Sequence, residues 1–352
     1  MRVLLVAAPL LGHVFPLVPL GRALRDAGHE VLVATGGDAV KVAGSGLPVE
    51  DVAPGFAMGR VALPVMLRHP LIARAELAGR AGTRGVRLLF GAVHDRIAGP
   101  VTALAERWRP DLVVHEPLAP AGTLAARRTG ARAVLHENTL FDARTLHALF
   151  PGVPQPDAVV SSAPPSVLPE RTGWPMRPVP YGGEVALDPS LAAPERPWVV
   201  VSRSTIAGGP VRDTLMDQVV AAAPAVDADF LLVRPPREYR LPPNVRTTGW
   251  APIPALLEHA AAIVHHGGAG TVLAALAAGV PQLVLNGAGD RRHNASLVAG
   301  RGAGLAADAV EPAVLRELLA GDHLRTAARE VAAEIAAMPS PAGVVPRLEG
   351  LA

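Results

Sequence analysis

The chain has 352 residues, which is enough for two packed domains and too many for one comfortable core. Half of the residues are hydrophobic and 18% are charged, a composition typical of a globular protein. No cysteine is present, so disulfides, thiolate nucleophiles, thiolate zinc sites and iron–sulfur clusters are excluded. The net charge is +2, aromatic residues make up 3%, and Lys41 is the one lysine, a pattern that argues against nucleic-acid binding.

The first twenty residues are apolar and could be mistaken for a signal peptide or a membrane helix. Pro9, Gly12, Pro16 and Pro19 interrupt them, however, and a membrane-spanning helix needs a longer unbroken apolar run. The pattern predicts a short buried strand over residues 3–8, followed by a glycine loop and a helix. We therefore expect a cytoplasmic enzyme without membrane insertion.

The order of the predicted elements indicates an α/β fold with two domains. Short apolar runs alternate with helical patterns, as in parallel sheets that are buried on both faces. Residues 151–197 interrupt this alternation with 12 of the 36 prolines and predict a linker. We predict an N-terminal domain over residues 1–180, a C-terminal domain over 198–338, and a tail over 339–352 that returns toward the first domain. Ligands of such folds bind at the carboxyl ends of the strands, here in a central cleft.

A glycine-rich segment, residues 261–281, is the clearest local motif. It predicts a buried strand that ends at His265, a tight turn, and a helix that Thr271 opens and that ends near Gly279. Backbone amides at such a helix N-terminus favour anions, so we expect an anion site. The motif lacks the Gly-Lys-Ser/Thr of a Walker loop and the spacing of dinucleotide-binding folds.

Several motifs together resemble one family of enzymes. Residues 265–271 (HHGGAGT), with 248–252 (TGWAP) before them and Asp290 after them, resemble the donor-binding region of inverting nucleotide-sugar glycosyltransferases. Residues 12–17 (GHVFPL) resemble the acceptor side of the same family, in particular the bacterial enzymes that glycosylate polyketides and other antibiotics. The similarity covers nearly the whole chain and implies the GT-B fold, in which two Rossmann-like domains face a cleft.

The resemblance also implies roles for residues of the C-terminal domain. The imidazole of His265 and the backbone amides of the glycine loop would hold the donor diphosphate, with no metal ion and no other cofactor. Trp250 would stack on the nucleobase, and backbone groups would recognise the edge of the base. The implied donor-binding residues are Thr205, Trp250, Ala251, Ile253, His265, Gly268, Ala269, Gly270, Thr271, Asp290 and Arg291.

On the acceptor side, the resemblance implies that His13 is the general base. An imidazole can take a proton from an acceptor hydroxyl near neutral pH as that hydroxyl attacks the anomeric carbon. Glu116, at the end of a predicted strand, would orient His13. Relatives usually have aspartate at this position.

Two further departures from the family bear on the donor. Ser204 stands where relatives usually have glycine, in the loop that contains Thr205. Arg291 follows Asp290 where relatives have a glutamine that binds a sugar hydroxyl, and arginine offers only donors. This loss of an acceptor predicts a deoxygenated sugar, in particular a deoxysugar carried by thymidine diphosphate.

Other sequence signals do not support a metal site. Asp227 and Asp229 match an Asp-x-Asp metal signature, but they lie in a predicted turn. The twelve histidines show no metal-binding spacing on a helix, and we expect His29, His69, His94, His147, His259 and His323 at the surface or in turns.

The predicted reaction is sugar transfer with inversion onto a small hydrophobic aglycone such as a polyketide. The apolar residues 54–100 are expected to form much of the acceptor pocket. Two alternatives stay open, a nucleotide-sugar 2-epimerase and a catalytically impaired activator of a partner glycosyltransferase. The linked atom and the oligomeric state are not fixed by the sequence, and a homodimer is one compatible state.

Overall fold

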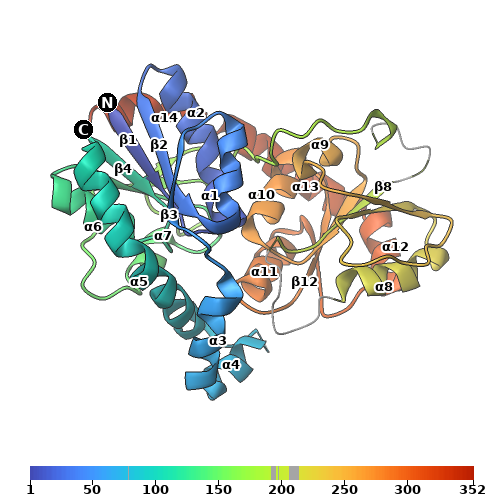
Figure 1. The fold of residues 1–352 in the computed structure, drawn as a ribbon. Coiled ribbons are helices and arrows are strands. Elements are labelled where there is room, and N and C mark those ends of the chain that lie inside the picture. The colour runs from blue at the N-terminus through green and yellow to red at the C-terminus, as the bar shows by residue number, and fades with distance from the viewer. Residues whose placement is uncertain (78, 192–195, 197, 206–213) are drawn as a thin grey trace. The chain divides into compact units, whose positions relative to one another are not determined.

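The computed structural model describes the chain except for residues 78, 192–195, 197 and 206–213. Two compact units make up the chain (Figure 1). The first contains residues 1–76, 81–181 and 337–352, and the second contains residues 77–80 and 182–336.

The first unit is built on a parallel sheet of seven strands in the order β3-β2-β1-β4-β5-β6-β7. Val3, Leu4, Leu5 and Val6 of the central strand β1 are completely buried. Since consecutive side chains point to opposite faces, both faces of the sheet are covered. The strands are β1 (Arg2–Val6), β2 (Glu30–Gly36), β3 (Val49–Ala53), β4 (Leu112–His115), β5 (Arg132–His136), β6 (Ala158–Ser161) and β7 (Trp174–Pro175).

Helices from both ends of the chain cover this sheet. The last helix packs against α2, and its buried Val344, Val345 and Leu348 join the core that lies on one face of β1. The helices of this unit are α1 (Leu11–Val14), α2 (Val18–Asp26), α3 (Met58–Arg68), α4 (Pro70–Leu77), α5 (Gly82–Trp108), α6 (Ala121–Thr129), α7 (Ala143–His147) and α14 (Pro341–Glu349). The long α5 leads from the sheet to α3 and α4, which lie at its N-terminal end (Figure 1).

The second unit has six parallel strands in the order β10-β9-β8-β11-β12-β13. The predicted doubly wound α/β organisation is thus confirmed in both units. The strands are β8 (Trp198–Ser202), β9 (Asp229–Val233), β10 (Val245–Thr248), β11 (Ala262–His265), β12 (Gln282–Leu285) and β13 (Gly304–Ala307). The helices are α8 (Leu215–Ala222), α9 (Ile253–Leu257), α10 (Ala269–Ala278), α11 (Arg291–Arg301), α12 (Pro312–Ala320) and α13 (Asp322–Ala337).

The proline-rich segment differs from the expected linker. Residues 151–197 contain β6 and β7, which extend the first sheet beyond β5. These strands have four and two residues, so neither is long enough to show a strand period among the prolines. Only the later part of this segment, from Gly182, belongs to the second unit.

Candidate active site and donor-binding site

His13 and Glu116 meet at the carboxyl edge of the first sheet. His13 lies in the short helix α1 that follows β1, and Glu116 comes directly after β4, the strand beside β1. His13 Nδ1 is 3.2 Å from Glu116 Oε1. The Glu116 side chain is completely buried, whereas the side chain of His13 is 20% exposed. The structure therefore brings together the two residues that the sequence proposed as base and orienting group.

The hydrogen bonds of Glu116 decide which nitrogen of His13 carries the proton. Glu116 Oε1 accepts the Ala8 N–H at 3.1 Å, and Oε2 accepts the Leu118 N–H at 2.7 Å. Because this carboxylate acts as an acceptor toward both amides, Nδ1 of a neutral His13 donates to it. The lone pair is then on Nε2, which is the atom that can accept a proton from a hydroxyl.

Two neighbours position the His13 segment further. The ring of Phe90, on α5, lies 5.2 Å from the imidazole, centroid to centroid. The Asn138 side chain donates to the His13 carbonyl at 3.4 Å. The imidazole is thus held by an apolar ring and a carboxylate that come from different parts of the first unit.

The structure corrects the role expected for the His265 side chain. Gly267 N–H donates to His265 Nδ1 at 3.1 Å, so the ring proton is on Nε2, which donates to Gln282 Oε1 at 2.8 Å. Burial lowers the pKa of His265 to about 4, so the ring is neutral. Both ring nitrogens are engaged inside the protein, and His265 supports the loop rather than offering a hydrogen bond to a phosphate.

The backbone of the glycine loop has the expected form of a strand-to-helix turn. Gly267 has a φ of +87°, which favours glycine, and Gly268 is the N-cap of α10. The helix begins at Ala269, two residues before the predicted start. The Thr271 N–H donates to the Gly268 carbonyl, so an anion here would be bound by the amides that precede Thr271.

Four cationic or imidazole side chains gather around this loop. Burial lowers the pKa of His266 well below its usual value, and the charges of Arg291 and Arg234 lower it further. Burial and the charge of Arg203 likewise lower the pKa of Arg234. His266 Nδ1 is buried and has no hydrogen-bond partner among the described residues. Sequence reasoning missed His266, Arg203 and Arg234, because their proximity arises only where the ends of separate strands meet.

Arg234 links this cluster to Trp250. Its guanidinium lies 4.8 Å from the centre of the Trp250 ring, and its Nη2 donates to the carbonyls of Arg203 at 3.4 Å and Ser204 at 3.5 Å. Arg234 has a φ of +55°, a strained conformation for arginine that is often found at functional sites. The Trp250 Nε1–H donates to the Gly182 carbonyl at 3.0 Å. The indole plane is therefore fixed, with a cation over one face.

Asp290 is connected to the glycine loop through Asn294. The Asn294 amide donates to Asp290 Oδ2 and to the Gly267 carbonyl, both at 2.8 Å. Arg291 begins α11 and lies against Gly267, where a Cβ would come within 3.3 Å of the Arg291 Cα. Asn294 was not singled out from the sequence, although its spacing of four residues from Asp290 on a helix was a usable signal.

The remaining predicted donor residues lie near this edge of the second sheet. Thr205 is exposed three residues after β8, and residues 206–213, which follow it in the sequence, lie outside the described residues. Ala251 is buried and Ile253 is half-buried at the start of α9, where both contact the core. The side chains of Ala251 and Ile253 thus have a packing role, which leaves only their backbone groups for a ligand.

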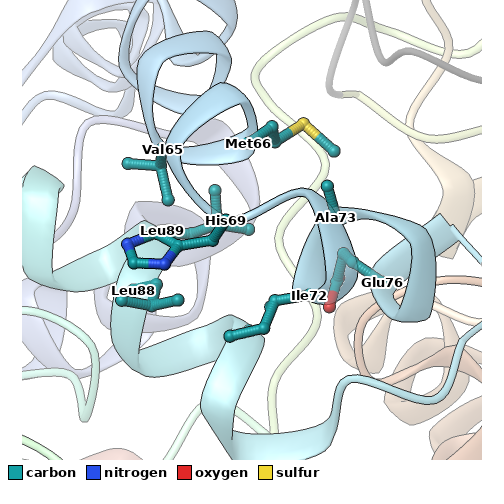
Figure 2. A pocket seen from close by; sticks show the side chains of 9 residues that line it. Val65, Met66, His69, Ile72, Ala73, Glu76, Leu88 and Leu89 are labelled. Carbon is teal, nitrogen blue, oxygen red and sulfur yellow. The ribbon is translucent and has the colours of Figure 1, made fainter.

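A small apolar cavity, partly open to solvent, lies among α3, α4 and α5 (Figure 2). Val65, Met66, Ile72, Leu88 and Leu89 line it, with His69 and Glu76 as polar members. Leu89 is followed on α5 by Phe90, the residue that contacts His13. The cavity lies within residues 54–100, where the acceptor pocket is expected.

The polar residues outside the site include a buried histidine and the two aspartates of the Asp-x-Asp signature. His147 was expected at the surface or in a turn, but it ends α7 and is completely buried. Its Nε2 donates to the Pro154 carbonyl, and its ring lies 5.4 Å from that of His115. Asp227 is exposed and pairs with Arg196, while Asp229 begins β9. Within the described ranges no cluster of three or more potential metal-binding side chains is found. In the same ranges no helix has the length and apolar character that crossing a bilayer requires.

Comparison with solved structures defines the class of protein. The chain is similar to the glycosyltransferase SnogD from Streptomyces nogalater, with 35% identity, a TM-score of 0.82, and coverage of 100% of this chain and 99% of that one. It is also similar to the Streptomyces glycosyltransferase SsfS6 complexed with thymidine diphosphate, at 29% identity, a TM-score of 0.82 and 99% coverage of both chains. Two parallel-sheet units with this likeness define a glycosyltransferase of the GT-B fold.

Family models and curated relatives identify the branch. Residues 22–203 match the N-terminal domain, and residues 214–351 the C-terminal domain, of the erythromycin biosynthesis protein CIII-like family. The elloramycin glycosyltransferase ElmGT of Streptomyces olivaceus is 39% identical over 99% of this chain and 97% of its own length. The chain belongs to the erythromycin biosynthesis protein CIII-like family of antibiotic-pathway glycosyltransferases.

Proposed function

We propose that this protein transfers a deoxysugar from a thymidine diphosphate donor, with inversion and without a metal ion, onto a hydrophobic natural-product aglycone. The observation that carries the proposal is the contact between His13 Nδ1 and the buried Glu116 carboxylate. It leaves His13 Nε2 to accept the acceptor proton, and Glu116 stabilises the imidazolium that forms. A hydroxyl activated in this way attacks the anomeric carbon as the diphosphate departs.

The electrostatics of the second unit support a diphosphate donor. Arg291 and His266 lie against the glycine turn that precedes α10, Arg234 lies near His266, and Arg203 lies near Arg234. The hydrogen bonds of the Arg234 Nη2 group go to carbonyls. Arg203, Arg234 and Arg291 are half-buried, and half-buried guanidinium groups are stabilised by an anionic ligand. They would also stabilise the leaving diphosphate, the task that metal ions perform in other enzymes. The similarity to a thymidine diphosphate complex supports the choice of nucleotide.

The direct test is a transfer assay with a panel of thymidine and uridine diphosphate sugars and several polyketide aglycones. We expect transfer from a thymidine diphosphate deoxysugar, with the opposite anomeric configuration in the product by NMR. Activity should survive EDTA. A product with retained configuration, or activity lost in EDTA and restored by a divalent metal, would contradict the proposed mechanism.

Arg234 and Trp250 should contribute to nucleotide binding in distinguishable ways. Trp250→Ala is expected to weaken thymidine and thymidine diphosphate alike, by about 1 to 3 kcal/mol, because both lose stacking. Arg234→Met should weaken thymidine diphosphate by about 1.5 to 3 kcal/mol and thymidine far less, because a charge-assisted contact to phosphate is lost. Isothermal titration calorimetry measures both.

The exposed Arg240, in the segment that follows β9, provides the control, and Arg240→Met should bind both ligands as the unmodified protein does. If Arg234→Met weakened the binding of thymidine and thymidine diphosphate equally, Arg234 would act only by packing on the Trp250 indole and not by contacting phosphate.

Arg291 should set the preference for the donor sugar. Arg291→Gln restores a hydrogen-bond acceptor and is expected to shift kcat/KM toward fully hydroxylated sugars, whereas Asp290→Ala should impair transfer from every donor. The readout is the ratio of kcat/KM for a deoxysugar donor to that for UDP-glucose. If the unmodified enzyme already uses UDP-glucose as efficiently as each deoxysugar donor, Arg291 does not determine this preference.

A further inference from the structure

The three most exposed large apolar side chains in the described part of the chain lie together on α3 and at the start of α4. They are Leu63, Leu67 and Leu71, with 59%, 73% and 83% of their surface accessible. Val179, Val185 and Leu241, the other exposed large apolar residues, are 37% to 50% accessible and far apart in the sequence. We call Leu63, Leu67 and Leu71 the leucine stripe, since their spacing of four residues places Leu63 and Leu67 one helical turn apart on the same face.

The packing of α3 fixes the direction of the stripe. Val61, Ala62, Val65 and Met66 on the other face of α3 are half-buried, and α3 packs against α5. Val65 and Met66 line the apolar cavity with Leu88 and Leu89 (Figure 2). The helix therefore already uses one apolar face inside the first unit and has a second apolar face outside. This second face needs a partner of its own.

The charged residues of these helices indicate the kind of partner, and Arg60 and Arg68 are the ones adjacent to the stripe on α3. The exposed arginines of α3, α4 and the first turns of α5 are Arg60, Arg68, Arg74, Arg84 and Arg87. Glu76 is the one acidic residue of these elements, so they carry a net charge of +4 on a chain whose total is +2. Among the described residues no ion pair is recorded for any of the five arginines. We therefore expect a partner that has an anionic surface and an apolar interior beneath it.

We propose that the face of α3 and α4 that carries the leucine stripe docks on the surface of an anionic lipid bilayer. The leucines would enter the boundary between headgroups and acyl chains, while the arginines contact lipid phosphates. This binding is peripheral and requires no spanning helix. Residues 57–89 contain no Phe, Tyr or Trp, so leucine and arginine are the contact residues of this face, and they suit the acyl chains and the phosphate headgroups of an anionic bilayer.

Vesicle flotation tests the proposal without donor or acceptor, so the outcome is independent of the glycosyl transfer reaction. The unmodified protein should bind vesicles of phosphatidylcholine with phosphatidylglycerol, and bind phosphatidylcholine alone much more weakly. Replacing the stripe by Leu63→Gln, Leu67→Gln and Leu71→Gln should reduce binding about tenfold or more. Replacing Arg60, Arg68 and Arg74 by glutamine should remove the preference for anionic vesicles.

The matched control combines Val179→Thr, Val185→Thr and Leu241→Gln, which change exposed apolar residues outside the stripe and should leave vesicle binding unchanged. Circular dichroism checks that each variant is folded. Equal binding to both kinds of vesicle, or binding that survives loss of the stripe, would overturn the proposal. A third outcome would also overturn the proposal: the protein does not bind vesicles but forms a concentration-dependent dimer, and the three glutamine substitutions abolish the dimer. The stripe would then join two copies of this chain.

Discussion

Replacing His13 with alanine is expected to lower turnover by about 10²- to 10⁴-fold while binding of thymidine diphosphate persists. The alanine removes the Nε2 lone pair that accepts the acceptor proton, whereas Arg203, Arg234 and Arg291, which we expect to bind the diphosphate, lie in the second unit. Steady-state turnover and calorimetric titration of the nucleotide separate the two effects. Near-normal turnover would remove His13 from the mechanism.

Glu116→Gln is the informative companion, although the structure makes it less conservative than its size suggests. Glu116 accepts the Ala8 and Leu118 amides in addition to facing His13. A glutamine presents one NH2 group to these donors, so we expect lower thermal stability as well as slower turnover. His13→Ala keeps all the acceptor atoms of Glu116 and should be the more stable variant, which a thermal unfolding experiment can show.

Acid should unfold this protein steeply, because several imidazoles are buried as neutral groups. Burial lowers the pKa of His115 to about 3, of His136 to about 4 and of His265 to about 4, and it lowers the pKa of His266 well below its usual value. The unfolded chain takes up these four protons below pH 6.5 and the folded chain does not, so stability is lost as the pH falls from 6.5 toward 4. Each proton corresponds to about 1.4 kcal/mol per pH unit.

Glu137 opposes this trend. Burial raises its pKa to about 7, so between pH 7 and about 4.5 the folded chain holds a proton that the unfolded chain releases. Four histidines against one glutamate leave three protons, and the free energy of unfolding should fall by about 4 kcal/mol per pH unit near pH 5.5, or more steeply because burial also lowers the pKa of His94 and of His147. Urea unfolding at a series of pH values measures this slope.

Two substitutions with opposite expected effects on the pH dependence of stability test whether these buried groups cause it. His136→Leu should flatten the slope by about 1.4 kcal/mol per pH unit, and Glu137→Gln should steepen it by a similar amount. His323→Gln, at an exposed position, is the control and should leave the slope unchanged. A slope that none of these buried substitutions alters would show that other groups govern acid unfolding.

Much of the fold and part of the site could be predicted from local sequence patterns. Val3 to Val6 predicts a buried strand without further context, and the HHGGAGT segment predicts a strand, a turn and a helix at nearly the right residues. The family resemblance predicted the pairing of His13 and Glu116, and it agrees with the general rule that the carboxyl ends of adjacent parallel strands meet at one edge. Such signals depend on neighbours in the sequence or on the general rules of the fold.

The rest of the site depends on contacts between residues that are distant in the sequence. His265 and His266 are adjacent, but the partner that engages the His265 ring is Gln282, seventeen residues away on the next strand. Arg234 acquires its place only when β8 and β9 align and bring it to the carbonyls of Arg203 and Ser204. No period or motif in a single segment contains that information.

The return of the chain to its first unit constrains how this enzyme can be recombined with its relatives. Residues 1–181 are not a complete unit, because α14 completes the core, Glu349 pairs with His29, and the Pro339 carbonyl accepts the Arg177 amide. A fragment that ends at Tyr181 would expose the apolar surface that α14 covers. A chimera designed to exchange acceptor preference should therefore take residues 1–181 and 337–352 from the same parent, with two crossover points instead of one.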